Sequence, residues 1–156
     1  MSFFPTPVIV GTDGTAAGRH ALLAAVELCR ATGSELHIVH VKLASGMLRG
    51  RPMTPAQRER TDEEARQLLE RELMAAEEAG MAVVGTHLRY GENAEQAFVS
   101  TQQELGAGLL VIGESRTGSL AQRLTSATGG SATGAVRRSP ASVLVVRQPP
   151  TEDARA

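Results

Sequence analysis

Short apolar runs alternate along the chain with longer segments in which apolar residues recur every three or four positions. The apolar runs have the length of β-strands and cover residues 7–11, 36–41, 81–89, 109–113 and 142–147. The longer segments carry helical periodicity and cover about residues 16–31, 54–79, 91–105 and 131–138. The pattern predicts strands and helices in strict alternation, with a loop over residues 42–53.

Such an alternation favours a mostly parallel sheet, because each strand returns to the sheet through a helical crossover. The predicted fold class is α/β, a three-layer, doubly wound, five-stranded sheet of order 3-2-1-4-5 with four helices. The most apolar runs, 7–11 and 109–113, are expected at the centre, and the less apolar run 81–89 at an edge. Sheets of this kind bind ligands at the carboxyl ends of the central strands, where the strand order reverses.

Composition narrows the classes of protein that fit. Residues 1–147 are expected to form one domain, and residues 148–156 a flexible tail. A net charge of −1 argues against a nucleic-acid partner. The chain has neither a secretory signal pattern nor an apolar stretch long enough to span a membrane, so a cytoplasmic location is expected.

Several kinds of active site find no support in the residues. The only lysine, Lys42, follows no glycine-rich segment, which excludes a lysine-dependent phosphate loop. The lone cysteine, Cys29, falls inside an apolar helical pattern, and no Gly-x-Ser-x-Gly motif is present. The four histidines lack the spacing of metal ligands. Dedicated catalysis is therefore not expected.

Two segments that follow the predicted central strands carry candidate binding chemistry. Asp13 follows the first strand, where it either caps the next helix, accepts from a ribose hydroxyl or holds Mg²⁺. The segment 113–131 contains four glycines, several hydroxyl residues and Arg116. It ends at Gly130-Ser131, a predicted helix start, where backbone N–H groups and the helix dipole favour phosphate. A plain flexible loop is the alternative interpretation of this segment.

The sequence resembles the universal stress protein family from about residue 7 to residue 147. The segments that carry the resemblance are 8–15 (VIVGTDGT), 38–41 (IVHV), 110–113 (LVIG) and 139–146 (SPASVLVV). The resemblance implies the doubly wound fold described above and a homodimer, paired through the last strand at Val143, Leu144, Val145 and Val146.

The loop after the fourth strand departs from the pattern of nucleotide-binding members, which is Gly, two residues, Gly, nine residues, then Gly-Ser or Gly-Thr. Counting forward from Gly113 places Arg116, Ser126 and Ala127 at the remaining positions. Counting back from Pro140 places Arg116 and Ser119 at the first two glycines and Gly129-Gly130 at the end. A shift of one residue supplies the dipeptide Gly130-Ser131.

The resemblance also implies roles for individual residues. Asp13 would lie near the ribose and a nucleotide-bound Mg²⁺, with Thr12 beside it, and the backbone of Val41 would contact the adenine. The phosphates would lie at Gly113, Gly130 and Ser131, while Arg116 would either clamp them or occupy their place.

Three functional hypotheses follow from the resemblance. The leading one is a stress-response protein that binds an adenine nucleotide, ATP, and acts as a dimeric regulator with at most slow hydrolysis. The second is a dimeric interaction module that binds no nucleotide. The third is an enzyme like the related adenine nucleotide α-hydrolases.

Overall fold

Five parallel strands form the central sheet of the protein. The computed structural model describes residues 2–43, 46–48, 50–92, 94–114 and 139–147. The strands of the sheet are β1 (Val8–Gly11), β2 (Leu36–Leu43), β5 (Gly85–Gly91), β6 (Leu109–Glu114) and β7 (Ser142–Arg147). They lie in the order β5-β2-β1-β6-β7, which is the predicted 3-2-1-4-5 order when these five strands are counted along the chain. The predicted α/β class and parallel sheet are confirmed.

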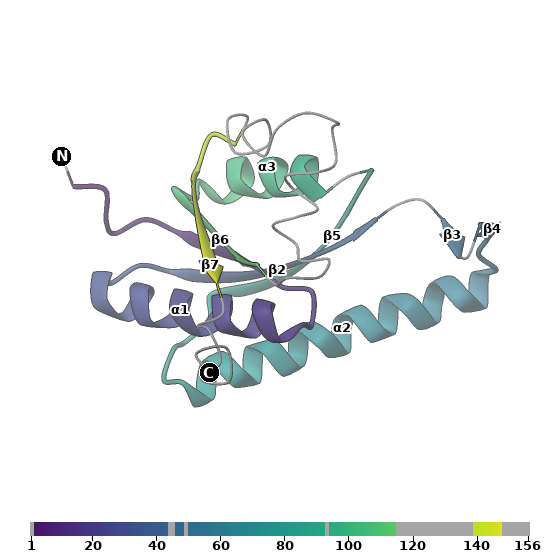
Figure 1. Ribbon diagram of the computed structural model, residues 1–156, viewed down its shortest axis with the longest axis horizontal. Coiled ribbons are helices and arrows are strands. Elements are labelled where there is room, and N and C mark those ends of the chain that lie inside the picture. The colour runs from purple at the N-terminus through teal and green to yellow at the C-terminus, as the bar shows by residue number, and fades with distance from the viewer. Residues whose placement is uncertain (1, 44–45, 49, 93, 115–138, 148–156) are drawn as a thin grey trace, which may run out of the picture.

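Helices cover both faces of this sheet. The described helices are α1 (Ala16–Thr32), α2 (Pro55–Glu78) and α3 (Ala94–Leu105). Figure 1 shows α1 and α2 on one face and α3 on the other, which gives the predicted three layers. The described part of the chain thus contains three helices rather than four, because the predicted helix at 131–138 lies outside the described residues.

Two boundaries differ from the prediction. The edge strand β5 begins at Gly85 rather than at Met81, because Met81 and Val83 belong to the connection from α2 and pack on the core there. The predicted loop 42–53 is partly ordered: β2 continues to Leu43, and a small antiparallel pair follows, β3 (Met47–Leu48) and β4 (Arg51–Pro52). This pair lies beyond the sheet, beside the start of α2 (Figure 1).

The core consists of two apolar layers separated by the sheet. One layer lies between the sheet and helices α1 and α2, and includes Val8, Val10, Leu22, Val26, Ile38 and Val111. The other lies beneath α3 and includes Ile9, Val39, Phe98, Leu110 and Ile112. Because alternate residues of β1 enter opposite layers, this strand is buried on both faces, which explains its continuous apolar run.

An ion pair between a buried carboxylate and an exposed guanidinium joins the two helices of the same layer. The apolar stripe of α2 is interrupted by Glu72, which is 4% exposed. Its two carboxylate oxygens accept from Nε and Nη2 of Arg19 in α1, at 3.2 and 2.9 Å. A bidentate pair of this kind satisfies a carboxylate that has left water, so α1 and α2 are fixed in register at this point.

Replacement of Arg19 by leucine is expected to lower the free energy of unfolding by about 2–3 kcal/mol, because Glu72 remains buried without its cation. The double variant Arg19→Leu/Glu72→Leu should be more stable than the single one, since no buried charge remains. The matched control is Arg66→Leu, which breaks the exposed Arg66–Glu63 pair and should cost less than about 0.5 kcal/mol. Urea unfolding followed by circular dichroism measures all three, and equal effects of Arg19→Leu and Arg66→Leu would contradict the assignment.

Candidate functional site

The carboxyl ends of three neighbouring strands, β2, β1 and β6, meet at one edge of the sheet. We refer to this region as the carboxyl edge. It includes four residues singled out in the sequence, namely Thr12, Asp13, Val41 and Gly113. Thr12 and Asp13 directly follow β1, Val41 lies in β2 beyond the level of the last β1 residue, and Gly113 lies near the end of β6. The remaining candidates, Arg116, Gly130 and Ser131, lie outside the described residues.

Asp13 shapes the turn that leads into α1, although it is not itself the N-cap. The cap is Thr15, whose hydroxyl oxygen accepts from the backbone N–H of Gly18 at 3.2 Å. Asp13 Oδ1 in turn accepts from the backbone N–H of Thr15 at 3.1 Å and from its hydroxyl at 2.5 Å. The sequence offered Asp13 itself as a helix cap. In the structure its carboxylate instead holds Thr15, the residue that caps the helix.

Thr12 is fixed by its backbone and keeps a buried hydroxyl. Its N–H donates to the carbonyl of Val39 at 2.9 Å, and its carbonyl oxygen lies 2.7 Å from Nδ1 of His40, which donates to it. The residue is 2% exposed, and its Oγ1 has no hydrogen-bond partner in the structure. A buried hydroxyl without a partner is costly, so this atom marks a place where a water or ligand would be stabilising.

The backbone of Val41 points into the same region. Residues 35 and 39 direct their carbonyl groups toward β1, since they accept from the N–H groups of Val8 and Thr12 at 2.8 and 2.9 Å. Because backbone groups alternate in direction along a strand, the carbonyl of Val41 is directed the same way. The paired register of β1 ends at Gly11, opposite Val39, so this carbonyl points past the end of the neighbouring strand.

Two glycines allow helix α1 to start directly against the strand ends. A Cβ at Gly113 would lie 2.1 Å from the carbonyl oxygen of Ala17, and one at Gly18 would lie 2.9 Å from Asp13 Oδ1. Gly113 has no room for a side chain, because the near atoms are backbone, whereas a side chain at Gly18 would displace the Asp13 carboxylate. The N-terminal turn of α1, with its partial positive charge, is thereby held at the ends of β1 and β6, where an anion would be favoured.

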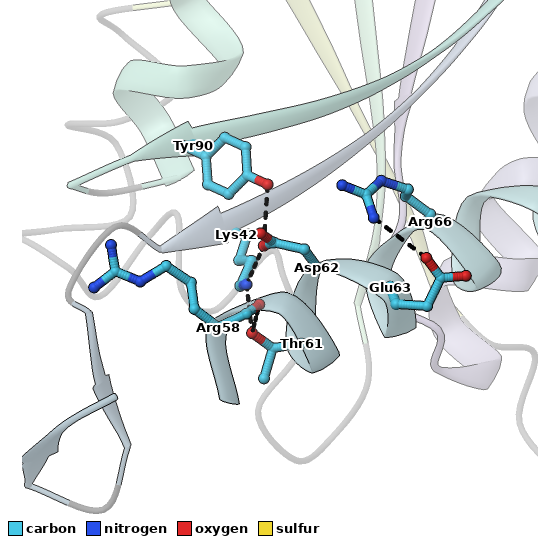
Figure 2. A network of polar contacts seen from close by, with 7 residues as sticks. All are labelled: Lys42, Arg58, Thr61, Asp62, Glu63, Arg66 and Tyr90. Carbon is cyan, nitrogen blue, oxygen red and sulfur yellow. Dashed lines mark hydrogen bonds and ion pairs between the residues drawn. The ribbon is translucent and has the colours of Figure 1, made fainter. Parts of the chain in front are cut away.

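A network of polar contacts braces the carboxyl edge from the α2 side, as Figure 2 shows. Lys42, next to Val41, donates to Thr61 at 2.6 Å and makes a short ion pair with Asp62 of α2. Tyr90, from the end of β5, donates to the same carboxylate at 3.0 Å. The hydrogen bond from Lys42 holds the pKa of the Asp62 carboxyl below its usual value. We call Lys42, Asp62 and Tyr90 the α2 brace.

The sequence interpretation did not assign a role to the α2 brace or to His40. The one available signal was that Lys42 is the only lysine in the chain, which draws attention to that position but names no partner. Among the described residues, no group of three or more His, Cys, Asp or Glu side chains is arranged to hold a metal ion. Within the same residues, no helix is both long and apolar enough to cross a membrane.

Comparison with known proteins gives one family and many similar folds. The model of the universal stress protein family matches residues 6–147. No curated protein sequence matches the chain. A solved universal stress protein in complex with cAMP is 23% identical, with a TM-score of 0.66, and the match covers 90% of this chain and 96% of that one.

Two further solved structures have the same fold. The universal stress protein of Archaeoglobus fulgidus in complex with dAMP is 18% identical, with a TM-score of 0.63 and coverage of 90% of this chain and 97% of that one. A universal stress protein family member from Arabidopsis thaliana with AMP bound is 15% identical, with a TM-score of 0.62 and coverage of 96% and 99%.

Substitution of Gly113 by alanine is expected to lower the free energy of unfolding by about 2–3 kcal/mol, because the added methyl group meets the α1 backbone. The matched control is Gly106→Ala, where no atom lies within 4 Å of the added Cβ and only the positive φ of 62° opposes the change. That control should cost about 1 kcal/mol. Urea unfolding of both variants checks the difference, and an effect of Gly113→Ala no larger than that of the control would show that α1 does not pack as described.

Proposed function

The chain belongs to the universal stress protein family, and we propose that it binds an adenine nucleotide, ATP, at the carboxyl edge and acts as a dimeric regulator. The observation that carries the proposal is the convergence of the Val41 carbonyl, the Thr12–Asp13 turn and the start of α1 at the carboxyl edge. This edge lies where the strand order reverses, which is the usual ligand position in doubly wound sheets.

Adenine nucleotides in similar folds support the choice of ligand. The three solved structures described above are complexes with cAMP, dAMP and AMP. Adenine differs from guanine in offering an amino donor where guanine has a carbonyl acceptor. The carbonyl of Val41 is an acceptor directed past the end of β1 at the carboxyl edge. It would therefore accept from the amino group of adenine and repel the carbonyl of guanine.

The polar residues of the turn would hold the sugar and phosphates. In this proposal the Asp13 carboxylate accepts from a ribose hydroxyl, and the hydroxyl of Thr12 gains the partner that the described residues do not supply. Gly113, Arg116, Gly130 and Ser131 would surround the phosphates. Asp13 is the one carboxylate of this turn, which suits an Mg²⁺ that arrives with the phosphates and keeps several waters.

Nucleotide binding is tested by titrating ATP, AMP and GTP into the protein in a calorimeter. We expect micromolar affinity for an adenine nucleotide and binding of GTP at least about tenfold weaker, because the Val41 carbonyl would oppose the guanine carbonyl. Asp13→Asn should weaken adenine nucleotide binding about tenfold, since a hydrogen bond to a charged group is lost. Asparagine keeps the oxygen that accepts from Thr15, so the turn should survive.

The matched control is Glu63→Gln, which neutralises an exposed carboxylate on α2 and should leave the affinity unchanged. Gly130→Asp, which places a carboxylate at the proposed phosphate end, should abolish binding. Absence of binding by the native protein at micromolar concentrations of all three nucleotides would end the proposal.

The second part of the proposal, a homodimer, rests on the edge strand β7. Among the described strands this one pairs only with β6, and its residues Leu144 and Val145 are 40% and 37% exposed. An apolar edge strand with an open row of backbone groups can pair with the same strand of a second copy, which would cover both.

Sedimentation equilibrium at micromolar concentrations should show a dimer for the native chain. Val145→Lys is expected to weaken the dimer at least about tenfold, because a charge would enter the paired edge. The matched control is Thr86→Lys, which places the same charge on the opposite edge strand, β5, and should leave the dimer intact. A strict monomer, or equal effects of the two lysines, would contradict pairing through β7.

A further inference from the structure

A row of polar side chains crosses the outer two strands on the face that α3 covers. It consists of Glu35, which precedes β2, His37 of β2, and His87 and Arg89 of β5. Ile9 and Val39, which lie beside these residues on the same face, belong to the apolar layer beneath α3. The polar row therefore continues the apolar layer toward the edge of the sheet, and we call it the histidine row.

The two imidazoles are in direct contact. Nδ1 of His37 lies 3.1 Å from Nε2 of His87, and the His37 side chain is 8% exposed. The other nitrogen of His87, Nδ1, lies 3.5 Å from Nη2 of Arg89. Nε2 of His37 lies 3.9 Å from Oε2 of Glu35, whose side chain is largely exposed.

The chemistry of these partners assigns the protons. A guanidinium can only donate, so Nδ1 of His87 accepts from Arg89, and the single proton of that neutral ring lies on Nε2. This N–H donates to Nδ1 of His37, whose own proton then lies on Nε2, facing Glu35. All the donors point in one direction along the row, from Arg89 to Glu35.

The same assignment shows what a further proton would do. On each ring the only basic nitrogen is Nδ1, and each Nδ1 already faces a donor. Protonation of either histidine would place two N–H groups against each other and would add a positive charge beside Arg89 or beside the other imidazole. The row is therefore complete only while both histidines are neutral.

Charged groups of neighbouring elements and burial act on the two imidazoles in opposite directions. From α3, Glu104 pairs with Arg89 at 2.9 Å and favours the protonated form of His87, and Glu35 favours that of His37. The neighbour of His37 in β1 is the apolar Ile9. Burial is the larger effect on both rings and holds the pKa of His37 and of His87 below the usual value of 6.5, with His37 and Arg89 lowering that of His87 further.

Gly85 indicates that the strands are built around this pair. It lies opposite His37 in the register of β2 and β5. A Cβ at this position would lie 3.0 Å from Nε2 of His87 and 3.5 Å from Nδ1 of His37. The missing side chain leaves the space that the two rings occupy.

We propose that the histidine row is an acid-sensitive fastening between β2 and the edge strand β5, which holds at neutral pH and releases β5 when the two histidines take up protons at acidic pH. The sign follows from linkage. When β5 is released, the two histidines bind protons near pH 6.5, whereas in the intact row they bind protons only at lower pH. The row therefore stabilises the pairing of β2 with β5 fully above pH 6.5, and this stabilisation is lost as the pH falls. This inference does not depend on nucleotide binding.

Hydrogen exchange at pH 7.5 and 5.5, corrected for the intrinsic rates, tests the fastening. Between these pH values the protection of the β5 amides, residues 85–91, should fall at least about tenfold relative to those of β6, residues 109–114. The variant His37→Asn/His87→Gln keeps an acceptor at the first position and a donor at the second but has no basic nitrogen. In that variant the ratio should change less than about twofold.

The matched control is His20→Gln, which removes an exposed histidine of α1 and should leave the native response unchanged. An unchanged ratio in the native protein, or a response that His20→Gln abolishes, would overturn the proposal. Should the double variant fail to fold, NMR titration of the native histidines decides the question. His37 and His87 should then titrate below the ordinary histidine value of 6.5, and titration of both at or above that value would equally overturn it.

Discussion

The structure depends most on the close contact between the first turn of α1 and the ends of the two central strands. At Gly113 the backbone of β6 approaches the carbonyl of Ala17 so closely that no side chain fits between them. At Gly18 the Asp13 carboxylate lies close instead, 2.9 Å from where a Cβ would be. This contact forces the chain to turn from β1 into α1 within a few residues, and the Asp13–Thr15 hydrogen bonds stabilise that turn. Backbone groups and one carboxylate are thereby gathered at one edge.

Helix α2 supports this arrangement at three points along its length. Cδ1 of Leu68 lies 2.9 Å from where a Cβ of Gly14 would be, Glu72 binds Arg19 of α1, and Asp62 binds Lys42 near the end of β2. The first and third contacts fall directly on segments that form the carboxyl edge. The helix also continues to the β3–β4 pair, which lies beyond the sheet (Figure 1). Helix α2 thus contacts the carboxyl edge and also begins beside the β3–β4 pair.

Hydrophobic periodicity predicted the fold well wherever burial on both faces imposes it, as at residues 8–10 and 109–112. It was less accurate at the edge, where the apolar residues 81–84 serve a connection, and it could not detect strands of two residues such as Met47–Leu48. The place of Asp13 directly after the first strand put it at the carboxyl edge, and the family resemblance added Val41. Spacing along the chain could not bring together His37 and His87, fifty residues apart, because only the register of β2 and β5 joins them.

Strands β2 and β5 are fastened on both faces of the sheet, near their carboxyl ends by the α2 brace and nearer their amino ends by the histidine row, and the two fastenings respond differently to acid. On the α2 side, Lys42 keeps the pKa of Asp62 below its usual value, so the α2 brace remains charged where histidines take up protons. On the α3 side, the histidine row loses its hydrogen bonds in that range. Val41 lies opposite Arg89 in the register, yet its backbone groups point toward β1 and away from β5. The proposed contact of Val41 with a nucleotide therefore depends on the α2 brace, and acid would loosen the outer edge of the sheet while the carboxyl edge keeps its shape.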